Sequence, residues 1–206
     1  MAVTLAELAI ADSADAWTQA GFTTDAAVCR VGSVGLRLGA EGRGIAGWAL
    51  AGLESDGVCD IDGVPTTSAA TIATGPVAHP NGVIAIDHVV LLSPNLGRTV
   101  EAFAAIGVAP RRERDAELGG RAVRQIFFRL GEVILEVVGA PGDAGAGPST
   151  LWGVTFTVAD VDATAAFLGE HTTPVKDAVQ PGRRITTLRH REVGMSVPTA
   201  FISASR

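Results

Sequence analysis

Hydrophobic and polar positions alternate in short runs along this chain, and several of these runs are followed by a helical pattern. Residues 84–107, IAIDHVVLLSPNLGRTVEAFAAIG, read as a strand and then a helix that ends at Gly107. Residues 5–22 read the same way, with an Asp/Ser cap before a short helix, and residues 152–169 start a third copy that is capped near Asp160. The chain is therefore expected to repeat one strand–helix unit.

Strand–turn–strand patterns follow the first two helices. Residues 29–40, CRVGSVGLRLGA, resemble residues 128–139, FRLGEVILEVVG, and both read as hairpins that turn at Gly32 and Gly131. In this alignment Arg37 falls opposite Glu136. A fourth, degraded start lies at residues 44–53, with no helix after it. The order predicts an α+β fold of repeated βαβββ modules that form a cupped, barrel-like sheet.

Small-residue stretches divide the chain. Residues 66–82 are rich in Pro, Gly, Ala and Thr and read as a linker, and residues 140–150 read as a loop. We expect residues 1–82 to hold reduced, degenerate modules and residues 83–206 to hold a complete two-module unit. The apolar strands of the first part are expected to pack on the second part or on a partner subunit, because exposed they would aggregate.

Composition narrows the class of protein. The 206 residues are 47% hydrophobic and 18% charged, with a formal net charge of −6, which argues against nucleic acid as a partner. No apolar run is long enough to span a membrane. Two cysteines and an N-terminus without a basic segment fit the cytoplasm, and the abundance of Ala, Gly and Arg is typical of a bacterial protein.

Asp87 and His88 interrupt a strand that is otherwise isoleucine, valine and leucine. A polar group that leaves water must find a partner, so these two side chains need an explanation. One reading is a structural histidine whose hydrogen bonds are satisfied. The other is a metal ligand or an acid/base group that points into a cavity.

Three stretches carry a resemblance to the vicinal oxygen chelate superfamily, which includes glyoxalases, extradiol dioxygenases and bleomycin-resistance proteins. They are IDHVVLLS, FFRLGEVILEVVG and WGVTFTVADVDATAAFL, and they span residues 84–206 in the family's order. The resemblance implies a cupped sheet around a divalent metal, held by one ligand from the first strand and one from the last strand of each module. It places His88 and Glu136 at the two ligand positions of the first module.

The second module departs from the family pattern. Gly153 falls where a histidine is expected and Phe201 falls where a glutamate is expected, and neither residue supplies a side-chain ligand. Divalent metal is therefore expected to bind weakly or not at all. His88 and Glu136 remain either half of a metal site, an acid/base pair or a satisfied buried contact.

Candidate ligand-binding residues surround that pair. Strand alternation predicts that Thr155 and Phe201 face the cavity, and that Gln125 or its neighbour does. Arg183 and Arg184 follow a Pro-Gly turn at the expected cavity mouth, where arginine binds carboxylate or phosphate in a forked geometry, with a solvated edge strand as the alternative. Trp152 is expected to pack at the core or the lid of the cavity.

Two functions follow from these residues and the resemblance. The first is a glyoxalase-like small-molecule enzyme with lyase, isomerase or related proton-transfer chemistry, in which His88 and Glu136 are catalytic and Arg184 anchors the substrate. The second is a non-catalytic binding protein of the bleomycin-resistance type. The expected partners are a small anionic molecule and a second copy of the chain.

Overall fold

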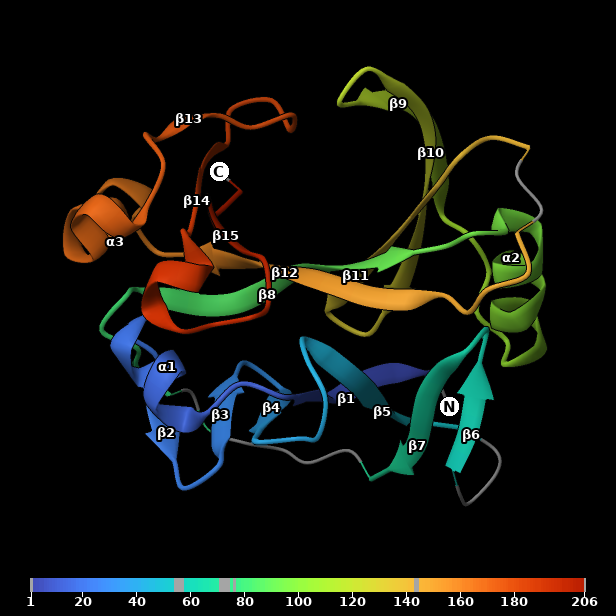
Figure 1. The fold of residues 1–206 in the computed structure, drawn as a ribbon, viewed down its shortest axis with the longest axis horizontal. Coiled ribbons are helices and arrows are strands. Elements are labelled where there is room, and N and C mark those ends of the chain that lie inside the picture. Colours follow the sequence, from blue (N-terminus) through green and yellow to red (C-terminus); the bar gives the residue numbers. More distant parts are fainter. Residues whose placement is uncertain (1, 54–57, 71–74, 76, 143–144, 206) are drawn as a thin grey trace.

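Two curved sheets stand back to back in the computed structural model of this protein, and their concave faces open in opposite directions (Figure 1). The structure describes residues 2–53, 58–70, 75, 77–142 and 145–205. The N-terminal sheet has the strand order β2-β3-β4-β1-β5-β7-β6 and the C-terminal sheet has the order β13-β14-β15-β12-β8-β11-β10-β9. We call their concave faces the N-terminal cup and the C-terminal cup.

The strands and helices have the following bounds. The N-terminal sheet contains β1 (Thr4–Ile10), β2 (Thr24–Asp25), β3 (Val28–Val31), β4 (Val34–Leu38), β5 (Ile45–Ala51), β6 (Val58–Ile61) and β7 (Val64–Ala69). The C-terminal sheet contains β8 (Val83–Leu92), β9 (Arg112–Leu118), β10 (Arg121–Leu130), β11 (Val133–Gly139), β12 (Thr150–Val158), β13 (Lys176–Asp177), β14 (Arg184–Thr187) and β15 (Thr199–Ser203). The helices are α1 (Ala14–Gln19), α2 (Leu96–Ala105) and α3 (Val161–Leu168), with short 3-10 turns at Gly169–His171 and His190–Val193.

The two sheets share one topology. In the C-terminal sheet β8 pairs in parallel with β11 and antiparallel with β12, which pairs in parallel with β15. In the N-terminal sheet β1, β4, β5 and β7 repeat these three pairings. The predicted α+β fold of repeated βαβββ modules is confirmed, although the described residues between β5 and β6 include no helix. The linker predicted at residues 66–82 starts too early, because residues 66–69 belong to β7, and residues 71–74 and 76 lie outside the described residues.

Polar side chains start each helix, as the sequence predicts. The Ser13 side chain accepts a hydrogen bond from the Ala16 amide, and the Asn95 side chain accepts one from the Arg98 amide. Asp160 caps α3 by accepting from two backbone amides. No helix in the described part of the chain is long and apolar enough to cross a membrane.

A single apolar core fills the space between the sheets. Ile86, Val89 and Leu91 of β8 are at most 5% exposed and face this core. Aromatic rings join the two halves, because Phe22, which follows α1, lies 5.0 Å from the Phe156 ring of β12. The apolar faces of the N-terminal strands therefore pack on the C-terminal sheet, and the polar faces of both sheets line the cups.

Buried aspartates link the N-terminal and C-terminal halves at their edges through hydrogen bonds. Asp62, in the β6–β7 turn, accepts hydrogen bonds from Thr99 at the start of α2 and from Ser149, the latter at 2.5 Å. Asp12, after β1, accepts from the Ser196 amide at 2.8 Å. Since buried carboxylates need such partners, these contacts fix how the two sheets sit on each other.

Candidate functional site

A β-bulge in β8 places Asp87 and His88 on the same face of the sheet. In the ladder with β12, Ile86 pairs with Phe156 and His88 pairs with Thr155, so Asp87 is an extra residue that has no partner residue on β12. Regular alternation would put Asp87 on the core side, behind His88. Because of the bulge, both polar side chains face the C-terminal cup and Ile86 stays in the core.

Asp87 binds two cationic or dipolar partners in the cup. Its carboxylate accepts a hydrogen bond from His88 Nδ1 at 2.8 Å and forms an ion pair with Arg183 Nη1 at 2.6 Å. Burial works to raise the pKa of Asp87, but the hydrogen bonds and charges of His88 and Arg183 outweigh it. The pKa of this carboxyl group therefore lies below its ordinary value of 3.8. Asp87 is thus an anion that orients the imidazole.

Glu136 lies on the other side of the His88 ring. Its Oε2 atom is 3.5 Å from His88 Nε2, and the two side chains are each 14% exposed. Gln125 donates a hydrogen bond from Nε2 to Glu136 Oε1, and Arg114 Nε donates to Gln125 Oε1 at 2.9 Å. A chain of polar contacts therefore crosses the cup from β9 to the start of β14.

The hydrogen-bond partners fix the protonation pattern of His88. An ionised carboxylate only accepts hydrogen bonds, so Nδ1 carries the hydrogen that Asp87 binds. In the neutral ring, Nε2 then carries no hydrogen, and its lone pair faces Glu136. A proton placed between Nε2 and Glu136 has two possible owners, and this is the arrangement that acid/base chemistry requires.

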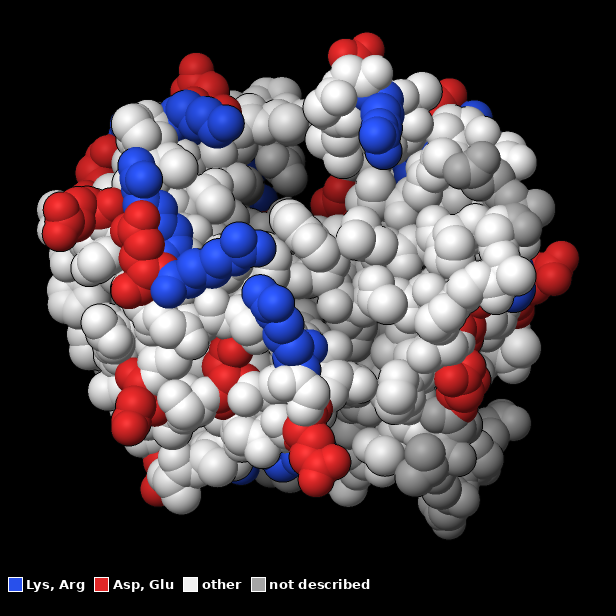
Figure 2. All heavy atoms as spheres, viewed as in Figure 1, with Lys and Arg blue, Asp and Glu red and all other residues white. Residues whose placement is uncertain are grey.

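The cup is open to solvent above this network. Figure 2 shows that the surface is hollowed between the end of the sheet that carries β13 and β14 and the end that carries β9 and β10, with acidic and basic atoms on its walls. A small molecule that entered this hollow would reach the floor strands β8 and β11.

The two arginines of the Pro-Gly turn have different positions. Arg183 reaches into the cup, where its side chain is 11% exposed and pairs with Asp87. The prediction that Arg184 anchors a substrate is wrong in its geometry, because Arg184 pairs with Asp162 on α3, outside the cup. Arg183 immediately precedes β14 and Arg184 is its first residue, and their side chains pair with carboxylates on different elements, β8 and α3.

Phe201 does not line the cup. Its ring is fully buried and pairs with Phe156 on the core side of the sheet, 6.4 Å from Phe22 of the other half. The ladder between β12 and β15 pairs Thr155 with Ala200, so Ala200 is the β15 residue on the His88 side. The prediction for Phe201 was one residue out of register, and a one-residue shift reverses the face.

The remaining candidates lie where their strands place them. Gln125 binds Glu136, and Thr155 is buried opposite His88. Trp152 is 50% exposed and is the unpaired residue at a second irregularity of the same ladder, so it is neither core nor part of the polar network. Arg114 was not among the candidates, because it lies in a strand with many exposed charges, RRERD at residues 111–115.

The donors in this cup do not complete a divalent metal site of the family's kind. His88 and Glu136 lie side by side, but the matching positions of the second module are Gly153 and Ala200, which carry no donor atom. Across the described ranges, no group of three or more His, Cys, Asp or Glu side chains is placed to hold a metal ion. Glu136 is also hydrogen-bonded to Gln125.

Solved structures with a similar fold include three enzymes. A variant of 4-hydroxymandelate synthase from Streptomyces coelicolor has 16% identity and a TM-score of 0.69, and the alignment covers 98% of this chain and 93% of that chain. A catechol 2,3-dioxygenase has 10% identity and a TM-score of 0.59, with 98% and 94% covered. A Mn(II)-bound glyoxalase from Novosphingobium aromaticivorans has 15% identity and a TM-score of 0.56, with 97% and 81% covered.

These comparisons show the fold alone, a cupped fold of βαβββ modules that this chain shares with the three enzymes and that the sequence predicted. No family model matches the chain, and no curated protein matches it in sequence. At such low identities the likeness supports no assignment of substrate or reaction.

Proposed function

We propose that the C-terminal cup catalyses proton transfer on a small anionic molecule, with His88 and Glu136 as the acid/base pair. The observation that carries this proposal is the position of His88 between two carboxylates, 2.8 Å from Asp87 and 3.5 Å from Glu136, in a solvent-open cup. The fold neighbours, a synthase, a dioxygenase and a glyoxalase, support an enzyme that acts on a small molecule.

The proposed roles follow from the hydrogen bonds. Asp87 holds the hydrogen on Nδ1, which leaves Nε2 to take a proton from an acidic C–H or O–H of the substrate. Glu136, 3.5 Å from Nε2, then takes that proton from the imidazolium and gives it back, so that Nε2 can return it to the substrate. A positioned acid/base group contributes about 10²- to 10⁴-fold to the rate of such a step.

Arg114 is the proposed anchor for the substrate's negative charge. Its guanidinium is bound to Gln125, lies 5.9 Å from the centroid of the Phe127 ring, and has no carboxylate partner among the described residues. Arg183, in contrast, is neutralised by Asp87. A charge-assisted contact to Arg114 would hold an anion at the β9 wall, one residue away from Glu136 in the polar network.

Proton exchange with solvent tests this proposal directly. The full chain would be incubated in D₂O with a panel of small 2-oxo and 3-oxo carboxylates, and deuterium uptake at carbon would be followed by NMR. We expect exchange with at least one compound, and a fall of about 100-fold or more in Glu136→Gln and His88→Gln. Arg124→Gln is the matched control, because Arg124 pairs with exposed Asp115 and not with the network.

Gln125 also supports a second candidate function, a binding protein without turnover. Its hydrogen bond occupies one Glu136 oxygen and can serve simply to satisfy a buried carboxylate. In that case a ligand found by thermal shift would bind without deuterium exchange, and Glu136→Gln would barely change its affinity. Exchange that is equally fast in wild type, Glu136→Gln and His88→Gln would contradict the catalytic proposal.

A further inference from the structure

The N-terminal cup repeats the polar pair of the C-terminal cup with different residues. In the C-terminal sheet His88 pairs with Ile134, and Glu136 lies two residues further along β11. In the N-terminal sheet Glu7 pairs with Gly35, and Arg37 lies two residues further along β4. Arg37 Nε donates to Glu7 Oε1 at 2.7 Å, so the equivalent positions again hold two polar side chains in contact.

One difference between the two cups creates space. Ile134 stands between Arg129 of β10 and His88, whereas Gly35 stands between Arg30 of β3 and Glu7. The N-terminal cup therefore lacks a four-carbon side chain at the centre of its floor. A cavity of about 180 Å³ occupies this place, a volume equal to roughly six water molecules.

Packing inside the chain does not explain the glycine at residue 35. A Cβ atom on Gly35 would meet its nearest neighbour, Glu7 Cγ, at 3.6 Å, which is an ordinary contact. The glycine at residue 47 of the same sheet is different, because a Cβ there would lie 2.7 Å from the Pro65 carbonyl oxygen. A strand glycine often marks the close approach of a ligand or another backbone, but the nearest backbone atom to a Cβ on Gly35 is the Ala6 carbonyl oxygen, at an ordinary 3.8 Å.

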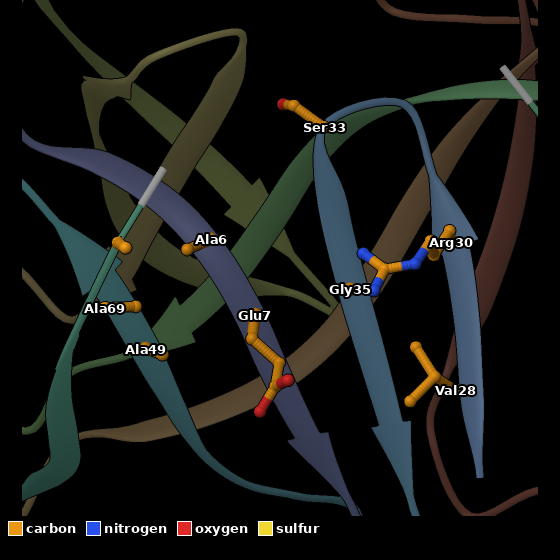
Figure 3. A pocket seen from close by; sticks show the side chains of 9 residues that line it. Ala6, Glu7, Val28, Arg30, Ser33, Gly35, Ala49 and Ala69 are labelled. Atoms are coloured by element: carbon orange, nitrogen blue, oxygen red, sulfur yellow. The ribbon is translucent and has the colours of Figure 1, made fainter. Parts of the chain in front are cut away.

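The walls of the cavity are apolar apart from Ser33 and the charged groups. Val28, Ala6, Ala49 and Ala69 line it, and Figure 3 shows the Arg30 side chain reaching from β3 over Gly35 on β4, toward the side of Glu7. Arg37 neutralises Glu7, but no carboxylate of the described residues pairs with Arg30. The cavity thus combines one uncompensated positive charge with a short apolar surface.

We propose that the N-terminal cup is a second ligand site, which takes a small monocarboxylate. Arg30 binds the carboxylate, and an apolar body of a few carbons lies over Gly35 against the alanines. This site faces away from the C-terminal cup and is separate from the proton-transfer chemistry proposed there.

Titration of the ¹⁵N-labelled full chain with butanoate, followed by backbone amide shifts, tests the site. We expect saturable shifts at residues 6–7, 28–37 and 49, and binding of the neutral analogue butanamide that is weaker by about tenfold or more. Arg30→Gln is expected to weaken butanoate binding about tenfold. Gly35→Val fills the cavity and is expected to abolish binding, with Gly35→Ala as the milder variant if the valine disturbs the fold.

Two control measurements decide the outcome. Arg111→Gln removes an exposed arginine of the other half and should leave the affinity unchanged, and the melting temperature of each variant shows whether the fold is intact. The proposal is overturned if the wild-type shifts at residues 6–7, 28–37 and 49 are absent. It is equally overturned if Arg30→Gln and Gly35→Val bind butanoate like wild type, or if the shifts cluster only around His88 and Arg114.

Discussion

His79 is held on both ring nitrogens by backbone groups of the N-terminal half. The Thr23 amide donates to Nδ1 at 3.0 Å, and Nε2 donates to the Arg30 carbonyl at 2.9 Å. The residue is 7% exposed. Burial lowers the pKa of His79 below its ordinary value of 6.5, and the hydrogen bond to the Arg30 carbonyl offsets only part of this effect. Protonation of Nδ1 would break the bond from Thr23.

Stability is therefore expected to fall as the pH falls from 7.5 to 5. The unfolded chain binds a proton at the histidine near pH 6.5, whereas the folded chain binds it only at lower pH, so acid favours unfolding. One such group changes the free energy of unfolding by at most about 1.4 kcal/mol per pH unit. Urea unfolding at several pH values measures the slope, and His79→Gln should make it shallower.

Burial also lowers the pKa of His190, so the His79→Gln variant should keep part of the pH dependence of the free energy of unfolding. A wild-type slope that His79→Gln leaves unchanged would show that this ring does not titrate with folding.

At the scale of single residues, the central pair and its neighbours Gln125, Thr155 and Arg183 were predictable from the sequence, and three other positions were not. His88 was identifiable because a polar group in an apolar strand must find a partner, and Glu136 because the resemblance places it at the matching position of the same module. Arg184 and Phe201 were misplaced because facing along a strand depends on the register, which composition does not reveal. Arg114 was missed because its strand is rich in exposed charges.

The bulge in β8 is the element on which the candidate site depends. Deletion of Asp87 would leave Ile86 next to His88 and would restore a regular ladder with Phe156 and Thr155. The shortened chain should therefore still fold, with His88 in the cup. Its stability should fall by roughly 1–3 kcal/mol, because Arg183 loses its carboxylate.

Deletion of Val89 is the matched control for this prediction. It lies in the regular part of the strand, where loss of one residue reverses the facing of every side chain before or after it. Circular dichroism with thermal melting should show a cooperative transition for the Asp87 deletion and none for the Val89 deletion. If both deletions melted alike, the bulge would not be a separable feature of the strand.

A hydrophobic pattern does not predict a β-bulge of this kind. The run of Ile86, Asp87, His88 and Val89 breaks strict alternation, and the sequence offers a structural histidine and a ligand as equally valid reasons. Helix boundaries were predictable because caps and glycines carry local information. The bulge, in contrast, is defined only by the partner strand β12.

At the scale of the whole molecule, each sheet needs the other to cover its apolar face. A fragment of residues 80–206 would expose Ile86, Val89, Leu91 and the Phe156 and Phe201 rings. Each such side chain contributes about 1.5–3 kcal/mol by burial. Their sum is similar to the 5–15 kcal/mol that stabilises a typical domain.

We therefore expect this fragment to be insoluble or to melt at a clearly lower temperature than the full chain. Calorimetry of the two proteins under the same conditions makes the comparison. A soluble fragment with an unchanged melting temperature would show that the N-terminal sheet is an independent domain. The full extent of that sheet was underestimated from the sequence, because β6 and β7 are short and the second module has no helix to mark it.

Along β1 and β8, side chains face either the core that the two sheets share or the cup of their own sheet, and this arrangement affects how such a protein can change in evolution. Replacements at Glu7 or His88 alter one cup and leave the interior wall between the sheets untouched. After duplication of an ancestral half, either copy could drift in chemistry while selection maintained only the common interior.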